Sequence, residues 1–310
     1  MTISFTRLGQ KGEGRFGNQL FQYAYLRTEA QKLNTTFYCP DWLGDYVFNL
    51  NDENERLKLP AGVSVNELKI DKNNRDIWGY YESEGFFDKD LIKRIFDFKA
   101  DKIKDASSKY SDIDFNNSTA LHFRFGDKFT ETYYMDMYYI PRVKYYVNAL
   151  LEIFKTHENS LAQNLLIFSD DIFLAKKEMN KIMRKFLRCI TKQNSHKKPN
   201  IKIIFMENNK DYEDLFLMSL CKNIICAPST FSWWAGYLNK REDKTIVFPK
   251  EKILRPKTKP VQQELIPMSN NWILIPALYP VVDNYYFVRY IKLFHVRVIE
   301  WTKIILGIKI

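Results

Sequence analysis

The sequence predicts an α/β protein with two Rossmann-like domains that face each other across a cleft. Three observations lead to this prediction. Short runs of apolar, β-branched residues alternate with helical patterns, which is typical of parallel sheets covered by helices. The alternation occurs on both sides of a charged, polar stretch at residues 100–117. The 310 residues of the chain are long for a single core and suit two domains.

The first domain is expected over residues 1–115. Its expected elements are a strand over Thr2–Leu8 and helices over Asn18–Leu33 and Lys89–Phe96. The turn Gly12–Asn18 connects that strand to the first helix, and its glycines let the backbone approach a ligand closely. A flexible turn in which Asn18 caps the helix is the alternative interpretation.

The second domain is expected over residues 116–275. The predicted strands are Ser118–Phe123, Leu165–Phe168, Ile201–Phe205, Asn223–Cys226 and Thr245–Phe248. The predicted helices are Pro141–Phe154, Ile172–Leu187, Asp211–Leu220 and Ala235–Asn239. Because ligands bind at the carboxyl ends of parallel strands, functional residues are expected directly after these strands.

Residues 276–310 are predicted to form a basic amphipathic helix. Its charged residues fall on one face at helical spacing: Arg289, Lys292, Arg297, Glu300 and Lys303. The helix either packs across the fold or lies on an anionic membrane surface.

Composition narrows the classes of partner and compartment. The net charge of +10 favours anionic partners such as nucleotides, nucleic acid or an anionic membrane. The four cysteines form no Cys-x-x-Cys pair, which indicates free thiols in a reducing compartment. No secretory signal and no membrane-spanning run is recognised. These features predict a cytoplasmic protein, which the membrane alternative for the C-terminal helix would place on the cytoplasmic face of the membrane.

The segment Ala227–Leu238 is the most informative motif. Hydroxyl side chains at Ser229, Thr230 and Ser232 precede a predicted helix, where backbone N–H groups and the helix dipole favour a phosphate. The adjacent tryptophans Trp233 and Trp234 are expected to pack rigidly behind this loop. An N-cap serine followed by two core tryptophans is the alternative interpretation.

A second motif, His122–Lys128, ends a predicted strand. Arg124 there is placed to make forked hydrogen bonds to a diphosphate and to stabilise the charge of a diphosphate leaving group. A buried histidine with an Arg–Asp ion pair is the alternative. A third motif, Ser169-Asp170-Asp171, could accept hydrogen bonds from ribose or guanine, cap a helix, or hold a divalent metal.

Taken together and in this order, the motifs resemble the inverting α-1,2-fucosyltransferases of glycosyltransferase family 11, which have GT-B architecture and use GDP-L-fucose. The segments that resemble the family are Gly14–Ala24, Trp78–Tyr81, His122–Lys128, Ser169–Asp171 and Ser229–Ala235, within a match over roughly residues 10–275. The chain departs from the family where Phe125 replaces a second arginine and Lys128 replaces an aromatic residue.

The resemblance implies transfer of L-fucose from GDP-L-fucose, with inversion, to O2 of a terminal β-galactose on an oligosaccharide acceptor. It implies no metal or other cofactor, and no nucleic-acid partner. Arg124 would stabilise the GDP leaving group, and either Asp127 or Glu131 would act as the base. The residues assigned to donor binding in this way are Arg15, Phe16, Gly17, Asn18, His122, Arg124, Ser169, Asp170, Asp171, Ser229, Thr230, Phe231 and Ser232.

Three alternatives remain open from the sequence. The first is a transferase on the same scaffold that uses another GDP-sugar or a non-galactose acceptor, which the change at Phe125 favours. The second is a metal-dependent transferase in which Ser169-Asp170-Asp171 binds manganese. The third is a non-catalytic basic protein that binds membranes or nucleic acid through charge alone.

Overall fold

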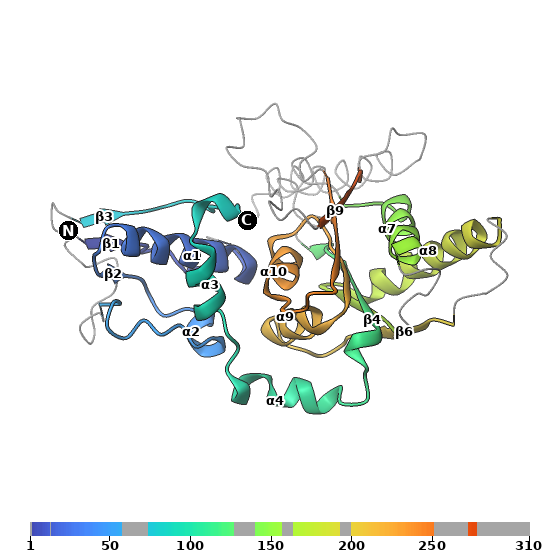
Figure 1. Ribbon diagram of the computed structural model, residues 1–310, viewed down its shortest axis with the longest axis horizontal. Helices are drawn as coiled ribbons and strands as arrows, with labels where there is room; N and C mark the ends of the chain where they lie inside the picture. The colour runs from blue at the N-terminus through green and yellow to red at the C-terminus, as the bar shows by residue number, and fades with distance from the viewer. Residues whose placement is uncertain are drawn as a thin grey trace, which may run out of the picture.

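The computed structural model describes residues 2–12, 14–57, 74–126, 140–156, 164–192, 200–250 and 272–277. It contains two parallel sheets with helices packed around them, which confirms the predicted α/β class (Figure 1). The predicted C-terminal helix, like Asp127 and Glu131, lies outside the described residues.

The N-terminal half is built on a small sheet with strand order β2-β1-β3. Its elements are β1 (Thr2–Ser4), α1 (Phe16–Lys32), β2 (Phe37–Tyr38), α2 (Leu43–Val47), β3 (Asn74–Asp76), the 3-10 turn η2 (Glu84–Phe86) and α3 (Lys89–Ile95). Strand β1 is shorter than predicted because the Thr6 backbone N–H leaves the ladder and donates to the Asp76 carboxylate at 3.0 Å. Helix α1 begins two residues earlier than predicted, with Arg15 in the N-cap position.

The C-terminal half is built on a six-stranded parallel sheet with the order β6-β5-β4-β7-β8-β9. The strands are β4 (Ser118–Phe123), β5 (Asn164–Ser169), β6 (Lys202–Phe205), β7 (Asn223–Ile225), β8 (Thr245–Pro249) and β9 (Trp272–Ile275). The helices are α7 (Val143–Thr156), α8 (Ile172–Lys192), α9 (Asp211–Leu220) and α10 (Thr230–Leu238). This is the doubly wound order 3-2-1-4-5-6, which reverses direction between β4 and β7.

The large sheet is buried on both faces. On β5, Leu165 and Ile167 join the core under α7 and α8, whereas Leu166 and Phe168 join the core beside α9 and α10. A strand buried on both sides shows a continuous apolar run, which is why β5 was recognisable in the sequence.

The core beside α9 and α10 continues into the N-terminal half. The ring of Phe21 on α1 lies 4.7 Å, centroid to centroid, from both Trp233 and Trp234 on α10. Figure 1 shows α10 on the side of the large sheet that faces α1. The two halves are therefore in direct aromatic contact between α1 and α10.

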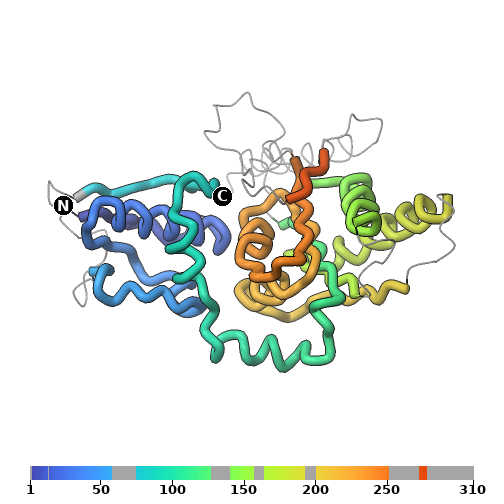
Figure 2. The backbone as a smooth tube through the Cα atoms, in the orientation of Figure 1, coloured from blue at the N-terminus to red at the C-terminus, as the bar shows by residue number. Residues whose placement is uncertain are grey.

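The charged stretch between the halves forms helix α4 (Ala100–Lys109), followed by the turn η3 (Phe115–Asn117). The connection runs along one edge of the molecule from the small sheet to the large one (Figure 2). Hydrogen bonds fix its end to the C-terminal half, because Lys109 Nζ donates to the Glu207 carbonyl at 2.7 Å and Tyr110 Oη to Asn209 Oδ1 at 3.0 Å.

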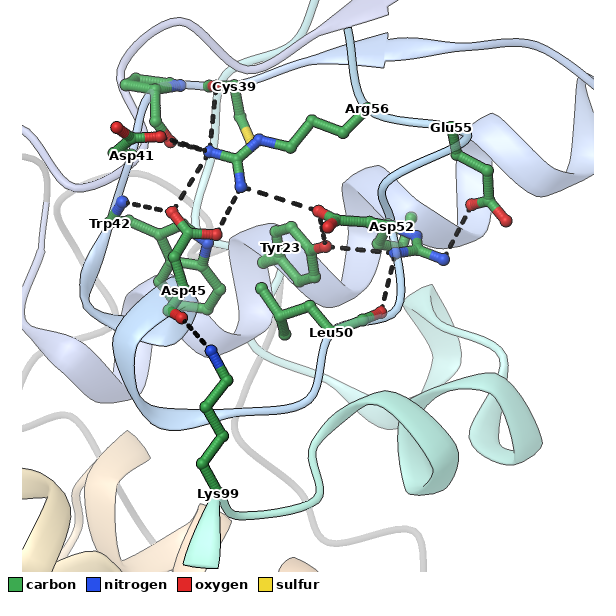
Figure 3. Close-up of polar contacts among 12 residues, drawn as sticks. Tyr23, Cys39, Asp41, Trp42, Asp45, Leu50, Asp52, Glu55, Arg56 and Lys99 are labelled. Carbon is green, nitrogen blue, oxygen red and sulfur yellow. Dashed lines mark hydrogen bonds and ion pairs between the residues drawn. The ribbon is translucent and has the colours of Figure 1, made fainter. Parts of the chain in front are cut away.

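A polar network stabilises the N-terminal half beneath α1 (Figure 3). The Arg56 guanidinium contacts the carboxylates of Asp41, Asp45 and Asp52 and donates to the carbonyls of Cys39 and Pro40. Beside it, Arg27 donates to Tyr23 Oη at 3.2 Å and to the Leu50 carbonyl at 3.2 Å. These arginines satisfy local backbone and side-chain groups, so their role is structural.

The four cysteines are free thiols, as the sequence predicted. Burial raises the pKa of Cys39, Cys221 and Cys226, which keeps these three thiols neutral and unreactive. None of the helices in the described part of the chain combines the length and the hydrophobicity that crossing a bilayer requires.

Candidate active site

The candidate site lies where the order of the large sheet reverses. Strands β4 and β7 are hydrogen-bonded neighbours, so the residues after Phe123 and after Ile225 leave the sheet side by side. Two tyrosines of α7 fix these strand ends. Tyr145 Oη donates to the Cys226 carbonyl at 2.7 Å, and Tyr146 Oη to the His122 carbonyl at 3.2 Å. This reversal point is the general ligand-binding position of open α/β sheets.

Asp170, directly after β5, joins both halves of the protein at this point. Its Oδ2 atom is paired with Arg124 Nη1 and lies 3.7 Å from Arg15 Nη1. Its Oδ1 atom accepts a hydrogen bond from the Phe125 backbone N–H at 2.8 Å. The Arg124 side chain is only 11% exposed, whereas that of Arg15 is 60% exposed. A carboxylate thus occupies a position that two guanidinium groups and one backbone N–H approach.

Phe125 packs in the core. It is 4% exposed and stacks on Phe123, with ring centroids 5.4 Å apart and an interplanar angle of 12°. His122 is 4% exposed and lies against Phe231, with centroids 5.6 Å apart. The aromatic side chain at 125 therefore serves packing, while its backbone N–H serves the site.

The serine-rich segment is more helical than the sequence predicted. Helix α10 begins at Thr230 rather than at Ala235, because Ser229 caps it by accepting from the Phe231 N–H at 3.3 Å. Ser232 is fully buried and donates to the Ala227 carbonyl at 3.1 Å. The capping interpretation thus describes Ser229 and Ser232, and the first turn of α10 directs its N-terminus toward the reversal point.

The N-terminal motif meets this helix end from the other half of the protein. Thr230 Oγ1 donates to Asn18 Oδ1 at 2.6 Å. Gly17 packs so closely that a Cβ there would lie 2.6 Å from the Phe231 backbone nitrogen. Gly14 has a φ of +118°, which favours glycine, and this conformation places Arg15 before the first turn of α1. The N-termini of α1 and α10 therefore converge.

The remaining acidic motif is occupied with capping. Ser169 Oγ accepts from the Asp171 N–H at 3.0 Å, and Asp171 Oδ1 accepts from the Leu174 N–H at 2.9 Å at the start of α8. Of this motif, the structure brings Asp170 to the arginines and uses Ser169 and Asp171 locally. Among the described residues, no group of three His, Cys, Asp or Glu side chains comes together as a metal site.

Comparison with known families identifies the chain. The model of Glycosyl transferase family 11 matches residues 63–275. The protein belongs to this family. The match ends where the sequence analysis placed it but begins at residue 63 rather than near residue 10, so the Gly14–Ala24 motif lies before it. Strands β4, β5 and β7 with the loops that follow them lie inside the match.

Two curated relatives come from Escherichia coli. The chain is 28% identical over 198 residues to the O-antigen biosynthesis glycosyltransferase WbnK, covering 60% of this chain and 58% of that protein. It is 28% identical over 169 residues to an alpha-1,2-colitosyltransferase, covering 54% of this chain and 52% of that protein. The matched region thus spans little more than half the length of each relative.

Among solved structures, the chain is similar to POFUT1 in complex with GDP. The sequence identity is 11%, the TM-score is 0.47, and the match covers 76% of this chain and 94% of that one. At this level the likeness transfers no residue roles to the family 11 chain. The assignments below rest on its own geometry.

Sequence reasoning missed three features of this glycosyltransferase family 11 site. It did not single out Tyr145 and Tyr146, whose hydroxyls fix the two strand ends, because tyrosines on an amphipathic helix look like core residues. It assigned Asp170 to the nucleoside rather than to the two arginines. It also placed Trp233 and Trp234 behind the loop without predicting their contact with α1. Nothing in the spacing of these residues predicts such long-range contacts.

Proposed function

We propose that this protein is a galactoside α-1,2-fucosyltransferase, which transfers L-fucose from GDP-L-fucose, with inversion, to O2 of a terminal β-galactose. One observation supports the proposal above all others. Guanidinium groups from both halves, Arg15 and Arg124, converge on one carboxylate at the reversal point of the large sheet. Two guanidinium groups that reach the same anionic group from opposite sides present the paired N–H groups that suit the oxygens of a diphosphate.

The diphosphate would bind between the arginines and the N-terminus of α10. Guanidinium groups remain charged at any physiological pH, and their paired N–H groups match phosphate oxygens. As the bond from the sugar to the diphosphate breaks, negative charge grows on the leaving group. Fixed positive charge at this place lowers the energy of the transition state more than that of the ground state.

The other donor-site residues keep supporting roles in this proposal. The backbone of Thr230 and Phe231 would bind phosphate oxygens at the helix N-terminus, with Ser229 shaping that turn. His122, packed on Phe231, would help to fix the ribose or guanine. Asn18 would contribute from the N-terminal half, which we assign to the acceptor side over residues 1–115, with residues 116–275 as the donor domain. Asp127 and Glu131 remain the candidate bases.

A metal is not part of the proposed mechanism, since the arginines supply positive charge where a metal would otherwise act. Asp170, the central residue of the acidic motif, is paired with Arg124. We therefore expect full transfer activity in excess chelator. Loss of activity in chelator, restored by manganese, would contradict this part of the proposal.

A second donor is supported by one of the relatives. That protein is named an alpha-1,2-colitosyltransferase, and colitose is L-fucose without the hydroxyl group at C3. The two donors would place the same diphosphate at the same arginines and differ only at the sugar. Transfer rates with the GDP-activated forms of both sugars, measured side by side, decide between them.

The test of the proposed function is thermal unfolding with GDP, UDP, ADP and CMP, each in excess chelator. A ligand that binds only the folded protein raises the unfolding midpoint. We expect GDP alone to raise it, followed by transfer from GDP-L-fucose to lactose. A shift with UDP in place of GDP would overturn the fucose assignment, and no shift with any nucleotide would overturn the donor site.

The C-terminal segment is a separate part of the proposal. We propose that residues 276–310 form a basic amphipathic helix that contacts anionic membrane surfaces. Deleting Tyr286–Ile310 should then reduce binding to liposomes that contain anionic lipid and leave the GDP-induced shift intact. Equal liposome binding by the deleted and complete chains would contradict it.

A further inference from the structure

The small N-terminal sheet has a reversal point of its own. In the order β2-β1-β3, strand β2 pairs with one edge of β1 and strand β3 pairs with the other edge. The direction in which strands are added to the sheet therefore reverses between β1 and β3. The general rule for open parallel sheets places ligands outside the carboxyl ends of strands at such a point. β1 and β3 end at the paired residues Ser4 and Asp76, and Arg7 and Trp78 follow.

Two aromatic side chains are exposed just after β3. Trp78 is 62% exposed and Tyr80 is 44% exposed, although the neighbouring Ile77 is only 4% exposed. The Arg7 guanidinium carbon lies 5.9 Å from the centroid of the Trp78 ring. A tryptophan, a tyrosine and an arginine are the residue types that most often dominate binding surfaces. Arg7 and Trp78 lie in contact at this reversal point, and Tyr80 is exposed two residues further along the chain, which favours a ligand site over isolated surface residues.

The backbone holds these rings outward at an energetic cost. Tyr81 adopts a φ of +48°, a left-handed conformation that aromatic residues rarely take, and Gly79 has a φ of +152°. Tyr81 Oη donates to the Trp78 carbonyl at 3.0 Å, and its ring stacks on Tyr25 with centroids 3.7 Å apart. Strain that the surrounding contacts maintain is characteristic of functional segments, and here it fixes the presentation of Trp78 and Tyr80.

Helix α1 connects this segment to the candidate donor site. Gln22 Nε2 donates to the Gly79 carbonyl at 3.2 Å. Gln22 lies four residues after Asn18, which contacts Thr230 at the N-terminus of α10. Residues four apart share one helix face and are about 6 Å apart along its axis. The exposed rings therefore belong to a surface that begins one helical turn from the seam between the two halves.

We propose that Trp78, Tyr80 and Arg7 form the acceptor platform, on which a sugar ring of the acceptor glycan binds. The C–H groups on the apolar face of a pyranose carry partial positive charge and stack on the negative face of an indole. Arg7 and Tyr80 beside the indole are side chains of the types that hydrogen-bond sugar hydroxyl groups. This inference rests on the proposed transferase function and names the residues that would receive its acceptor.

The test compares Trp78→Ala with a matched control, Phe173→Ala. Phe173 is an aromatic residue on α8 of the other half and is 78% exposed, so both substitutions remove an exposed ring. With GDP-L-fucose and lactose, Trp78→Ala should raise the KM for lactose roughly tenfold. The KM for GDP-L-fucose and the GDP-induced thermal shift should stay within about twofold of the wild type, and Phe173→Ala should match the wild type throughout.

The outcomes separate the acceptor platform from the proposed function. An unchanged lactose KM in Trp78→Ala would overturn the platform while leaving the donor site intact. If the wild type does not use lactose, the galactose assignment fails. The acceptor platform is then tested by measuring which immobilised oligosaccharides each protein binds in the presence of GDP. Glycans retained by the wild type and Phe173→Ala but lost by Trp78→Ala would support the platform. Equal retention, or retention by none of the three, would overturn it.

The same surface could instead bind a second copy of the chain. Sedimentation of the wild type and Trp78→Ala at one concentration distinguishes this outcome. A larger species that Trp78→Ala converts to monomer would assign the surface to self-association and overturn the acceptor platform. Identical sedimentation supports it together with the kinetic result.

Discussion

Two arginine–carboxylate clusters in this protein centre on equally buried arginines but are built from different parts of the chain. The side chains of Arg56 and Arg124 are 13% and 11% exposed. Around Arg56, one guanidinium faces the three carboxylates of Asp41, Asp45 and Asp52. At the reversal point, the guanidinium groups of Arg124 and Arg15, which come from different halves of the protein, meet at the carboxylate of Asp170.

The difference separates a structural cluster from a binding site better than burial does. Surplus carboxylates neutralise Arg56 completely, and the nearby carbonyls of Cys39 and Pro40 take further N–H groups. At Asp170, in contrast, guanidinium groups from the two halves of the protein reach one carboxylate, and the paired N–H groups of such guanidinium groups also suit phosphate oxygens. Substitutions in the two clusters test this contrast, and changes at Asp214 and Ser229, outside both clusters, give a scale for the effects.

Replacing Arg56 with alanine should destabilise the protein by about 3 kcal/mol, because the largely buried carboxylates of Asp45 and Asp52 lose the cation that compensates them. Urea unfolding of the variant measures the loss. GDP should still raise the midpoint of whatever folded protein remains. A variant as stable as the wild type would contradict the structural role that we assign to this cluster.

Replacing Arg124 with alanine should lower transfer by roughly 100- to 1,000-fold, the effect of removing one donor to a developing negative charge. The unfolding midpoint should change far less than in Arg56→Ala, because Asp170 keeps the Phe125 N–H and the nearby Arg15. Steady-state kinetics with GDP-L-fucose measures the loss of transfer, and thermal unfolding measures the change in the midpoint. Near-normal transfer would exclude Arg124 as the diphosphate ligand.

Asp214 on α9 lies in neither cluster, and its carboxylate is paired with an amide rather than with an arginine: Asn209 Nδ2 donates a hydrogen bond to it at 2.8 Å. Burial raises the pKa of Asp214 to about 7, despite the opposing hydrogen bond from Asn209. The folded protein therefore binds a proton more tightly than the unfolded chain, and stability falls as pH rises from about 4 to about 7.

The expected fall from Asp214 is roughly 2 kcal/mol, because the half-buried side chain keeps part of its hydration. Unfolding free energies measured from pH 4 to pH 8 should show it in the wild type and a flatter profile in Asp214→Asn. Parallel profiles for the two proteins would assign the pH dependence to other groups.

Replacing Asp170 with asparagine removes the negative charge and keeps an oxygen that accepts from the Phe125 N–H. Because the variant no longer places a negative charge beside Arg124 and Arg15, it repels a diphosphate less, and GDP should bind roughly tenfold more tightly, as calorimetry would measure. Turnover should fall, since the asparagine orients Arg124 less firmly. Asp45→Asn is the control from the other cluster and should leave GDP affinity unchanged. Weaker GDP binding in Asp170→Asn would contradict the charge argument.

The smallest effect is expected from Ser229→Ala, which removes the cap of α10 and should cost about 1 kcal/mol of stability. The GDP-induced thermal shift should decrease less than in Arg124→Ala, because the backbone N–H groups of the helix remain. A loss of the shift as large as that of Arg124→Ala would make the Ser229 hydroxyl a principal phosphate ligand.

Much of the C-terminal half could be predicted from the sequence. Strand β4 and helix α9 have the predicted bounds, and β5, β7 and β8 differ from them by a residue or two. Their apolar runs and amphipathic periods are local properties of the chain. The small sheet was predicted less well, because β1 and β2 are only three and two residues long and carry little pattern.

The candidate site was likewise predicted only in part. The position of Arg124 after a buried strand, and of Ser229 before a helix, could be read from neighbouring residues. The bonding of Ser229 and Ser232 within their own turn could not, because the helix start was predicted five residues too late. A cap and a phosphate-binding loop use the same residue types, so composition alone does not separate them.

By itself, the sequence determined the α/β class and the strand ends that bear Arg124 and Ser229, because hydrophobic periodicity and the alternation of strands and helices along the chain are local patterns. Only the tertiary structure decided that Asp170 pairs with Arg124, 46 residues away, and that Asn18 meets Thr230, 212 residues away. Only it placed Arg7 beside Trp78. Such contacts depend on how two sheets pack through a shared aromatic core, which no local pattern encodes.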